Sequence, residues 1–177
     1  MRCFIAIEIP DECRRELSYT QDKLRKVPGL QAKFVETENL HLTLKFLGEI
    51  SDSEVARVKK ALSSVKSSSF KAHFGKSGVF PSESSARVIW ISLEPVDEVE
   101  DLAEKINDVL DQKDERFESH ITLARVRNVA NKALLKKALQ DVKIEKKKFE
   151  IKNFKLMKST LTAKGPIYED VTSFTLD

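Results

Sequence analysis

Apolar residues recur at alternating positions in several short stretches of this chain, a pattern that predicts β-strands with one buried face. The first stretch, residues 1–9, contains Phe4, Ile5, Ile7 and Ile9 and is closed by Pro10. Similar stretches predict further strands at residues 34–35, 41–47, 70–80, 87–93, 118–126, 148–156 and 167–176.

Four other stretches carry apolar residues at helical spacing, at residues 11–27, 51–65, 95–110 and 131–139. In the second of these, Ser51 is followed three residues later by Glu54, the pair that forms a capping box at a helix start. Several strands follow one another through short turns, so we expect a mainly antiparallel α+β architecture rather than a doubly wound parallel sheet. No linker divides residues 1–177, which predicts a single domain.

The most informative pattern is a repeated tetrapeptide, His-Leu-Thr-Leu at residues 41–44 and His-Ile-Thr-Leu at residues 120–123. Side chains alternate between the faces of a strand, so each copy places its His and Thr on one face and its apolar pair on the other. The elements around the two copies follow a similar order. This indicates two related halves with a cleft between them that brings His41 and His120 together.

A single copy of this motif would indicate a structural histidine, but two matched copies that hold two of the three histidines favour a functional site. A pair of imidazoles can supply one base and one acid near neutral pH, and each neighbouring hydroxyl can bind a phosphate oxygen. The pattern therefore predicts phosphodiester chemistry without a metal.

Composition is typical of a soluble globular protein, with 41% hydrophobic and 33% charged residues and a net charge of +3. The charge is uneven, because residues 94–118 hold eleven acidic and three basic side chains, whereas residues 143–158 hold seven lysines and two glutamates. The basic run could attract a polyanion, although such runs are also typical of solvated surfaces.

Cysteine use and hydropathy indicate a protein of the cytoplasm. Cys3 and Cys13 have no metal-binding or redox spacing, and we expect both to be packed thiols. No secretion signal is recognised, and no apolar run approaches the roughly 20 residues that span a bilayer.

The two motifs resemble the duplicated signature of the two-histidine (2H) phosphoesterase superfamily, and within it the RNA 2',3'-cyclic phosphodiesterase family, also called 2'-5' RNA ligase. The similarity covers nearly the whole chain, through Met-Arg-Cys-Phe-Ile-Ala-Ile at 1–7, His-Leu-Thr-Leu-Lys-Phe-Leu-Gly at 41–48, Gly-Val-Phe-Pro at 78–81, Arg-Val-Ile-Trp at 87–90, His-Ile-Thr-Leu-Ala-Arg at 120–125, Ser-Thr-Leu-Thr at 159–162 and Gly-Pro-Ile-Tyr at 165–168. The resemblance implies two pseudo-symmetric lobes, each with a mainly antiparallel sheet flanked by helices, and an active-site groove between them.

The resemblance also implies an activity: hydrolysis of a 2',3'-cyclic phosphate at an RNA end to a 2'-phosphate, with a reversible 2'-5' joining reaction. By analogy with the family, His41 is the acid and His120 the base, although joining would reverse these roles in a site that is nearly symmetric. Thr43 and Thr122 would bind the non-bridging phosphate oxygens. No metal or other cofactor is implied, the partner is RNA with a cyclic phosphate end, and we expect a monomer.

Other residues receive more limited interpretations. Arg125 follows the second motif and is expected to contact the phosphate, but strict alternation places it on the face opposite His120, so the strand must twist or bulge there. The corresponding residue of the first motif, Phe46, is expected in the core, as is Trp90, and His73 is expected to be a surface or capping residue. The remaining candidates for RNA contact are Ser159, Lys158, Lys164 and Tyr168, with Tyr168 able to stack on a base and Ser159 equally compatible with a turn.

Three alternatives stay open at this point. The chain could be a non-catalytic protein that binds RNA ends, or a phosphodiesterase for another cyclic nucleotide or a 2'-5' oligonucleotide. A metalloprotein that uses both histidines is disfavoured, since the sequence lacks the usual spacings of metal ligands.

Overall fold

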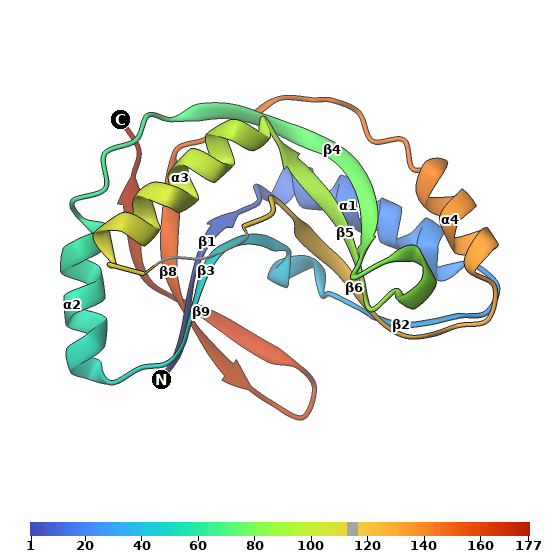
Figure 1. Ribbon diagram of the computed structural model, residues 1–177, viewed down its shortest axis with the longest axis horizontal. Coiled ribbons are helices and arrows are strands. Elements are labelled where there is room, and N and C mark those ends of the chain that lie inside the picture. Colours follow the sequence, from blue (N-terminus) through green and yellow to red (C-terminus); the bar gives the residue numbers. More distant parts are fainter. Residues whose placement is uncertain (113–116) are drawn as a thin grey trace.

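The computed structural model describes residues 1–112 and 117–177 and arranges its strands in one strongly curved sheet, the arch in Figure 1. The main path of the sheet runs β7-β4-β5-β6-β3-β1-β8-β9, and β2 pairs with β6 beside this path. Neighbouring strands pair antiparallel throughout, as the sequence predicts. The strands are β1 (Arg2–Glu8), β2 (Leu30–Phe34), β3 (His41–Glu49), β4 (Phe70–Phe80), β5 (Val88–Glu94), β6 (Ile121–Val129), β7 (Phe149–Ile151), β8 (Asn153–Leu161) and β9 (Pro166–Thr175).

The helices match the four predicted stretches, except that α4 extends one residue beyond its stretch. They are α1 (Asp11–Arg25), α2 (Asp52–Leu62), α3 (Val96–Val109) and α4 (Lys132–Gln140), and two 3₁₀ turns, η1 (Thr37–Asn39) and η2 (Glu83–Ser85), complete the elements. The capping box of α2 is confirmed: the Glu54 amide donates to the Ser51 hydroxyl, and the Glu54 carboxylate accepts from the Ser51 amide. After α1, Gly29 adopts a positive φ of 75°, and a Cβ at this position would lie 2.6 Å from the Cβ of Ala130.

The two faces of the sheet differ in their packing. Ile5 and Ile7 of β1 belong to the large core, together with apolar residues of all four helices. Phe4 and Ala6 point to the other face and form a small separate cluster with Met157. The α+β class is therefore confirmed, and the helices pack on the face of Ile5 and Ile7, while the face of Phe4, called the open face below, carries the small cluster.

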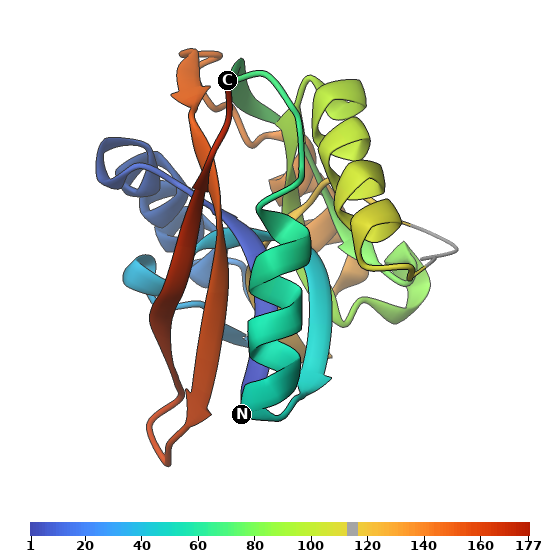
Figure 2. The same cartoon turned by 90° about the vertical axis from the view of Figure 1, so that its left-hand side faces the viewer.

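One predicted strand is divided in two. The stretch 148–156 breaks at Lys152 into β7, which pairs with β4, and β8, which pairs with β1. β7 and β8 lie far apart in the strand order, although only one residue separates them along the chain. The sheet must therefore curl back on itself to bring them together (Figure 2). The curl encloses the core. It depends on pairing between strands that are distant in the chain, so a local pattern of apolar residues does not predict it.

Within the described part of the chain, no helix is both long and apolar enough to cross a membrane.

Replacing Ser51 by Ala should lower the free energy of unfolding by about 1 kcal/mol, because the first turn of α2 loses its N-cap. Ser51→Asn should retain nearly all of the stability, since Asn is an equally good N-cap residue. Urea denaturation followed by circular dichroism measures both variants, and equal midpoints for Ser51→Ala and the wild type would contradict the structural role of this cap.

Candidate active site

The two histidine motifs lie side by side in the sheet. Leu42 of β3 and Ile121 of β6 are direct antiparallel partners, and both are completely buried. Continuing this register places His41 opposite Thr122 and Thr43 opposite His120, all on the open face. Diagonal neighbours in such a pair are roughly 7–8 Å apart, so His41 and His120 are close enough to act on one small group.

Both imidazoles are oriented in the same way by the backbone. The Nδ1 of His41 lies 2.7 Å from the Asn39 carbonyl oxygen, and the Nδ1 of His120 lies 2.8 Å from that of Glu118. A carbonyl oxygen can only accept, so Nδ1 carries a proton in each ring and Nε2 is the atom left for proton transfer. In the first motif, the Nε2 of His41 is 3.0 Å from the Thr43 hydroxyl, which can donate to it.

Burial lowers the pKa of His41, and the positive charge of Arg14 and the proximity of His120 lower it further. The hydrogen bond to Asn39 opposes these effects without cancelling them. The neutral ring is therefore favoured in the free protein, and an anionic phosphate beside Nε2 would shift the balance back towards the protonated ring.

A bulge at the last residue of each motif changes the orientation of the residues that follow. In β6, Thr122 pairs with Trp90 and Ala124 pairs with Ile89, so Leu123 has no direct partner. The extra residue returns Arg125 to the face of His120, although strict alternation would place it on the opposite face.

The same shift occurs in β3 and corrects one prediction. Ala6 pairs with Thr43 and Ile5 pairs with Lys45, which leaves Leu44 unpaired. Lys45 then lies on the inner face and is buried, whereas Phe46 lies opposite Phe4 on the open face and is 68% exposed. Phe46 is thus not a core residue but occupies the position equivalent to Arg125 in the other half.

Gln21 of α1 holds the bulge of β6 from behind. Its side chain is completely buried, and its Nε2 donates to the carbonyl oxygens of Val35 and Leu123, each at 2.8 Å. Leu123 is the bulged residue itself, and its carbonyl oxygen also accepts from the Val35 amide at 3.0 Å. The buried Gln21 amide therefore links Val35, the residue after β2, to Leu123. Leu123 is the bulged residue that turns Arg125 to the open face.

Aromatic rings surround both histidines. His41 has its ring centroid 4.9 Å from that of Phe4 and 5.2 Å from that of Tyr168, and His120 lies 5.1 Å from Phe80. The contacts of His41 with Tyr168 and of His120 with Phe80 are both edge-on, at 89°. Trp90 stacks on Phe80 and is half-buried on this face, so the expected core position of Trp90 is wrong.

The structure brings only some of the candidate RNA contacts to this face. Ser159 lies in β8 opposite Tyr168 of β9, rather than in a turn. Burial raises the pKa of Tyr168 above its ordinary value, although the positive charge of nearby Arg125 opposes this. Lys158, the residue before Ser159, lies on the opposite face of β8 and forms an ion pair with Glu169 at 3.1 Å. Lys164 lies in the turn that connects β8 and β9, where its carbonyl oxygen faces the Lys33 Nζ at 3.5 Å.

The basic run does not form one surface at the motifs. Residues 141–148 pass along the outer side of the arch (Figure 1), and Lys155 is half-buried between Glu8 and Asp170. His73 lies in β4, which β5 separates from the motif strands β6 and β3, and its Nδ1 contacts the Phe74 carbonyl oxygen at 3.0 Å. The described residues contain no group of three or more His, Cys, Asp or Glu side chains placed to hold a metal ion.

Comparison with known proteins agrees with this arrangement. The family model described as LigT like phosphoesterase matches residues 7–90 and 92–168. This chain belongs to the LigT-like phosphoesterase family. The phosphoesterase family inferred from the two motifs is thereby confirmed.

Relatives of known name extend over the same length. RNA 2',3'-cyclic phosphodiesterase of Archaeoglobus fulgidus is 36% identical over 98% of this chain and 99% of its own, and that of Thermotoga maritima is 33% identical over 96% and 92%. The crystal structure of TT0787 of Thermus thermophilus superposes with a TM-score of 0.80, at 29% identity over 99% of this chain and 98% of TT0787. Escherichia coli LigT complexed with ATP has the same fold, with a TM-score of 0.76 at 24% identity over 99% of this chain and 97% of LigT.

Removing the Gln21 amide should weaken activity through Arg125. Gln21→Leu has a similar volume but releases the bulge carbonyl, so we expect kcat/KM to fall about tenfold, within the range for losing one buried hydrogen-bonding group. In an Arg125→Ala background the same substitution should have little further effect. Steady-state kinetics of the four proteins measures this coupling, and equal losses in both backgrounds would contradict it.

The pH profile should respond to Arg14. Its positive charge lowers the pKa of His41, so Arg14→Gln should raise that pKa and move the limb of the kcat/KM profile that His41 sets towards higher pH. A shift of the alkaline limb identifies His41 as the acid, and a shift of the acid limb identifies it as the base. Arg15→Gln, an exposed position on the same helix, is the control and should leave both limbs unchanged.

Proposed function

We propose that this chain hydrolyses RNA 2',3'-cyclic phosphate ends to 2'-phosphomonoesters by acid–base catalysis between His41 and His120. The strongest support is the antiparallel pairing of Leu42 with Ile121, which brings the two motifs side by side. The names of the relatives from Archaeoglobus fulgidus and Thermotoga maritima favour RNA as the substrate class. Both histidines come from one chain, which supports a monomer of residues 1–177 as the catalytic unit.

In the proposed reaction, the Nε2 of His120 removes a proton from water as the water oxygen attacks phosphorus. The bond from phosphorus to the ribose 3'-oxygen breaks, and the Nε2 of His41 gives its proton to that oxygen. The product carries the phosphate on the 2'-oxygen and a free 3'-hydroxyl. His41 ends neutral and His120 protonated, and exchange with solvent restores both.

The neighbouring side chains would stabilise the charge on the phosphate. The hydroxyls of Thr43 and Thr122 would donate to the non-bridging oxygens, with the Thr43 hydroxyl leaving the Nε2 of His41 as substrate enters. Arg125, on the same face, would pair with the phosphate. A 5'-hydroxyl of a second strand that attacks in place of water would give 2'-5' joining. His120 would again be the base and His41 the acid, so the exchange of roles expected from the sequence belongs to cleavage of the 2'-5' bond rather than to its formation.

Substituting either histidine by Ala should lower kcat on a cyclic-phosphate RNA oligomer by several orders of magnitude, since each removes one of the two proton-transfer groups. His73→Ala is the matched control, because His73 lies in β4 away from both motifs, and it should keep wild-type turnover. The assay is run with excess chelator, and the ribose position of the product phosphate is determined by NMR.

Three outcomes would contradict the proposal. A 3'-phosphate product would mean that the 2'-oxygen, not the 3'-oxygen, is the leaving group. Loss of activity in chelator would indicate a metal-dependent reaction. Tight binding of the oligomer without any turnover by the wild type would favour a non-catalytic protein that binds RNA ends.

A further inference from the structure

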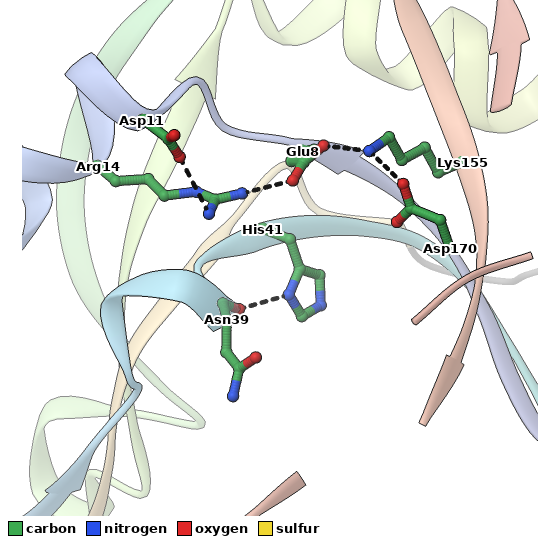
Figure 3. Close-up of polar contacts among 7 residues, drawn as sticks. All are labelled: Glu8, Asp11, Arg14, Asn39, His41, Lys155 and Asp170. Atoms are coloured by element: carbon green, nitrogen blue, oxygen red, sulfur yellow. Dashed lines mark hydrogen bonds and ion pairs between the residues drawn. The ribbon is translucent and has the colours of Figure 1, made fainter. Parts of the chain in front are cut away.

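A pocket of about 250 Å³ lies beside His41, and His120 is not among the residues that line it. It is lined by residues of β1, α1, η1, β3, β8 and β9, among them His41 itself. Figure 3 shows several of these residues, with Asn39 next to the His41 ring and Glu8, Arg14 and Asp170 around it. The volume is close to the lower end of the range for small-molecule sites, so it suits a group the size of one heterocycle.

Asn39 supplies a hydrogen-bond acceptor to this pocket. Its side chain is 9% exposed, and its Nδ2 donates to the carbonyl oxygen of Pro166 at 3.0 Å. That carbonyl can only accept, which fixes the amide orientation and leaves Oδ1 as an acceptor with no partner among the described residues. A ligand that reaches this oxygen with an N–H group would supply the partner that it lacks.

Glu38 supplies a second acceptor at the rim. Its side chain is exposed and lines the pocket, and within the described residues it has no hydrogen bond or ion pair. The carboxylates deeper in the pocket differ, because Glu8 is bound by Arg14 at 2.8 Å and by Lys155, and Asp170 is bound by Lys155 at 2.6 Å.

The two cations at this pocket, Arg14 and Lys155, already form ion pairs with carboxylates. Burial raises the pKa of the Glu8 carboxyl, but hydrogen bonds and charge from Lys155 and Arg14 outweigh this and hold it below its ordinary value. The charges of Arg14 and Lys155 are thus balanced by Glu8 and Asp170, and Glu38 leaves an excess of negative charge. A phosphate is disfavoured in this pocket, whereas a neutral group with N–H donors is favoured.

Two further lining residues provide an apolar wall. The ring of Tyr168 packs edge-on against His41, and Met157 belongs to the small cluster with Phe4. An aromatic ring and a thioether give a flat heterocycle a surface to contact, and the acceptors of Glu38 and Asn39 can bind its polar edge.

We propose that this pocket receives the base of the nucleoside that carries the cyclic phosphate, and that it selects bases with an exocyclic amino group over uracil. The inference rests on the proposed function, in which His41 protonates the 3'-oxygen of that same nucleoside. Adenine, cytosine and guanine offer an amino group to the two acceptors, whereas uracil presents a single N–H between two carbonyl oxygens, which a carboxylate repels.

The test compares hydrolysis of the four 2',3'-cyclic mononucleotides by the wild type, Glu38→Gln and Glu12→Gln. For the wild type, we expect kcat/KM with the amino-bearing bases to exceed that with uracil by about tenfold, mainly through KM. Glu38→Gln introduces an N–H donor for a uracil carbonyl and should reduce the ratio to about threefold or less. Glu12→Gln removes the same charge at an exposed position of α1 and should retain the wild-type ratio.

The outcomes separate this inference from the function on which it rests. Turnover of all four nucleotides with equal kcat/KM, or an equal loss for all four bases in Glu38→Gln, would overturn the base pocket and leave the phosphodiesterase standing. If the wild type hydrolyses none of the four nucleotides and no RNA oligomer, the proposed function fails and the inference falls with it. A base-dependent change confined to Glu38→Gln supports both.

Discussion

The arrangement of the site depends on one contact between strands, the antiparallel pairing of Leu42 with Ile121. These residues are buried against the helices, and their burial fixes which face of each strand is turned to the core. A slip of one residue in either strand would bury a histidine and expose an apolar residue. The free energy of the hydrophobic core is therefore what holds the two catalytic candidates in register.

The two halves share a backbone plan but differ in chemistry. Each has a histidine tied to a carbonyl two residues earlier, a threonine on the same face, and a bulge that exposes the residue three positions after the threonine. That residue is Phe46 in one half and Arg125 in the other. Pseudo-symmetry of the backbone thus allows one half to offer an aromatic surface and the other a cation to a substrate that is itself asymmetric.

Sequence periodicity predicts what depends on neighbours in the chain, namely the helices, most strands and the capping box of α2. It also predicts the side of the strand on which His41, Thr43, His120 and Thr122 lie. It fails for Phe46, because a bulge breaks the alternation and the partner strand, not the local sequence, decides where the bulge occurs. It fails for Trp90 for another reason: the strand alternates regularly there, so burial of Ile89 and Ile91 turns Trp90 to the other face. The role of Asn39 could not be found either, since its side chain contacts Pro166 of β9, which is distant in the chain.

The way in which the imidazoles are oriented has a consequence for sequence divergence. Both Nδ1 atoms donate to main-chain oxygens, so the tautomer of each ring is independent of the side chains at positions 39 and 118. Those positions can change identity without altering which nitrogen is left free for proton transfer. Such an arrangement separates the reaction that a site performs from the residues that decide what it accepts, and it lets ligand preference drift while the reaction stays the same.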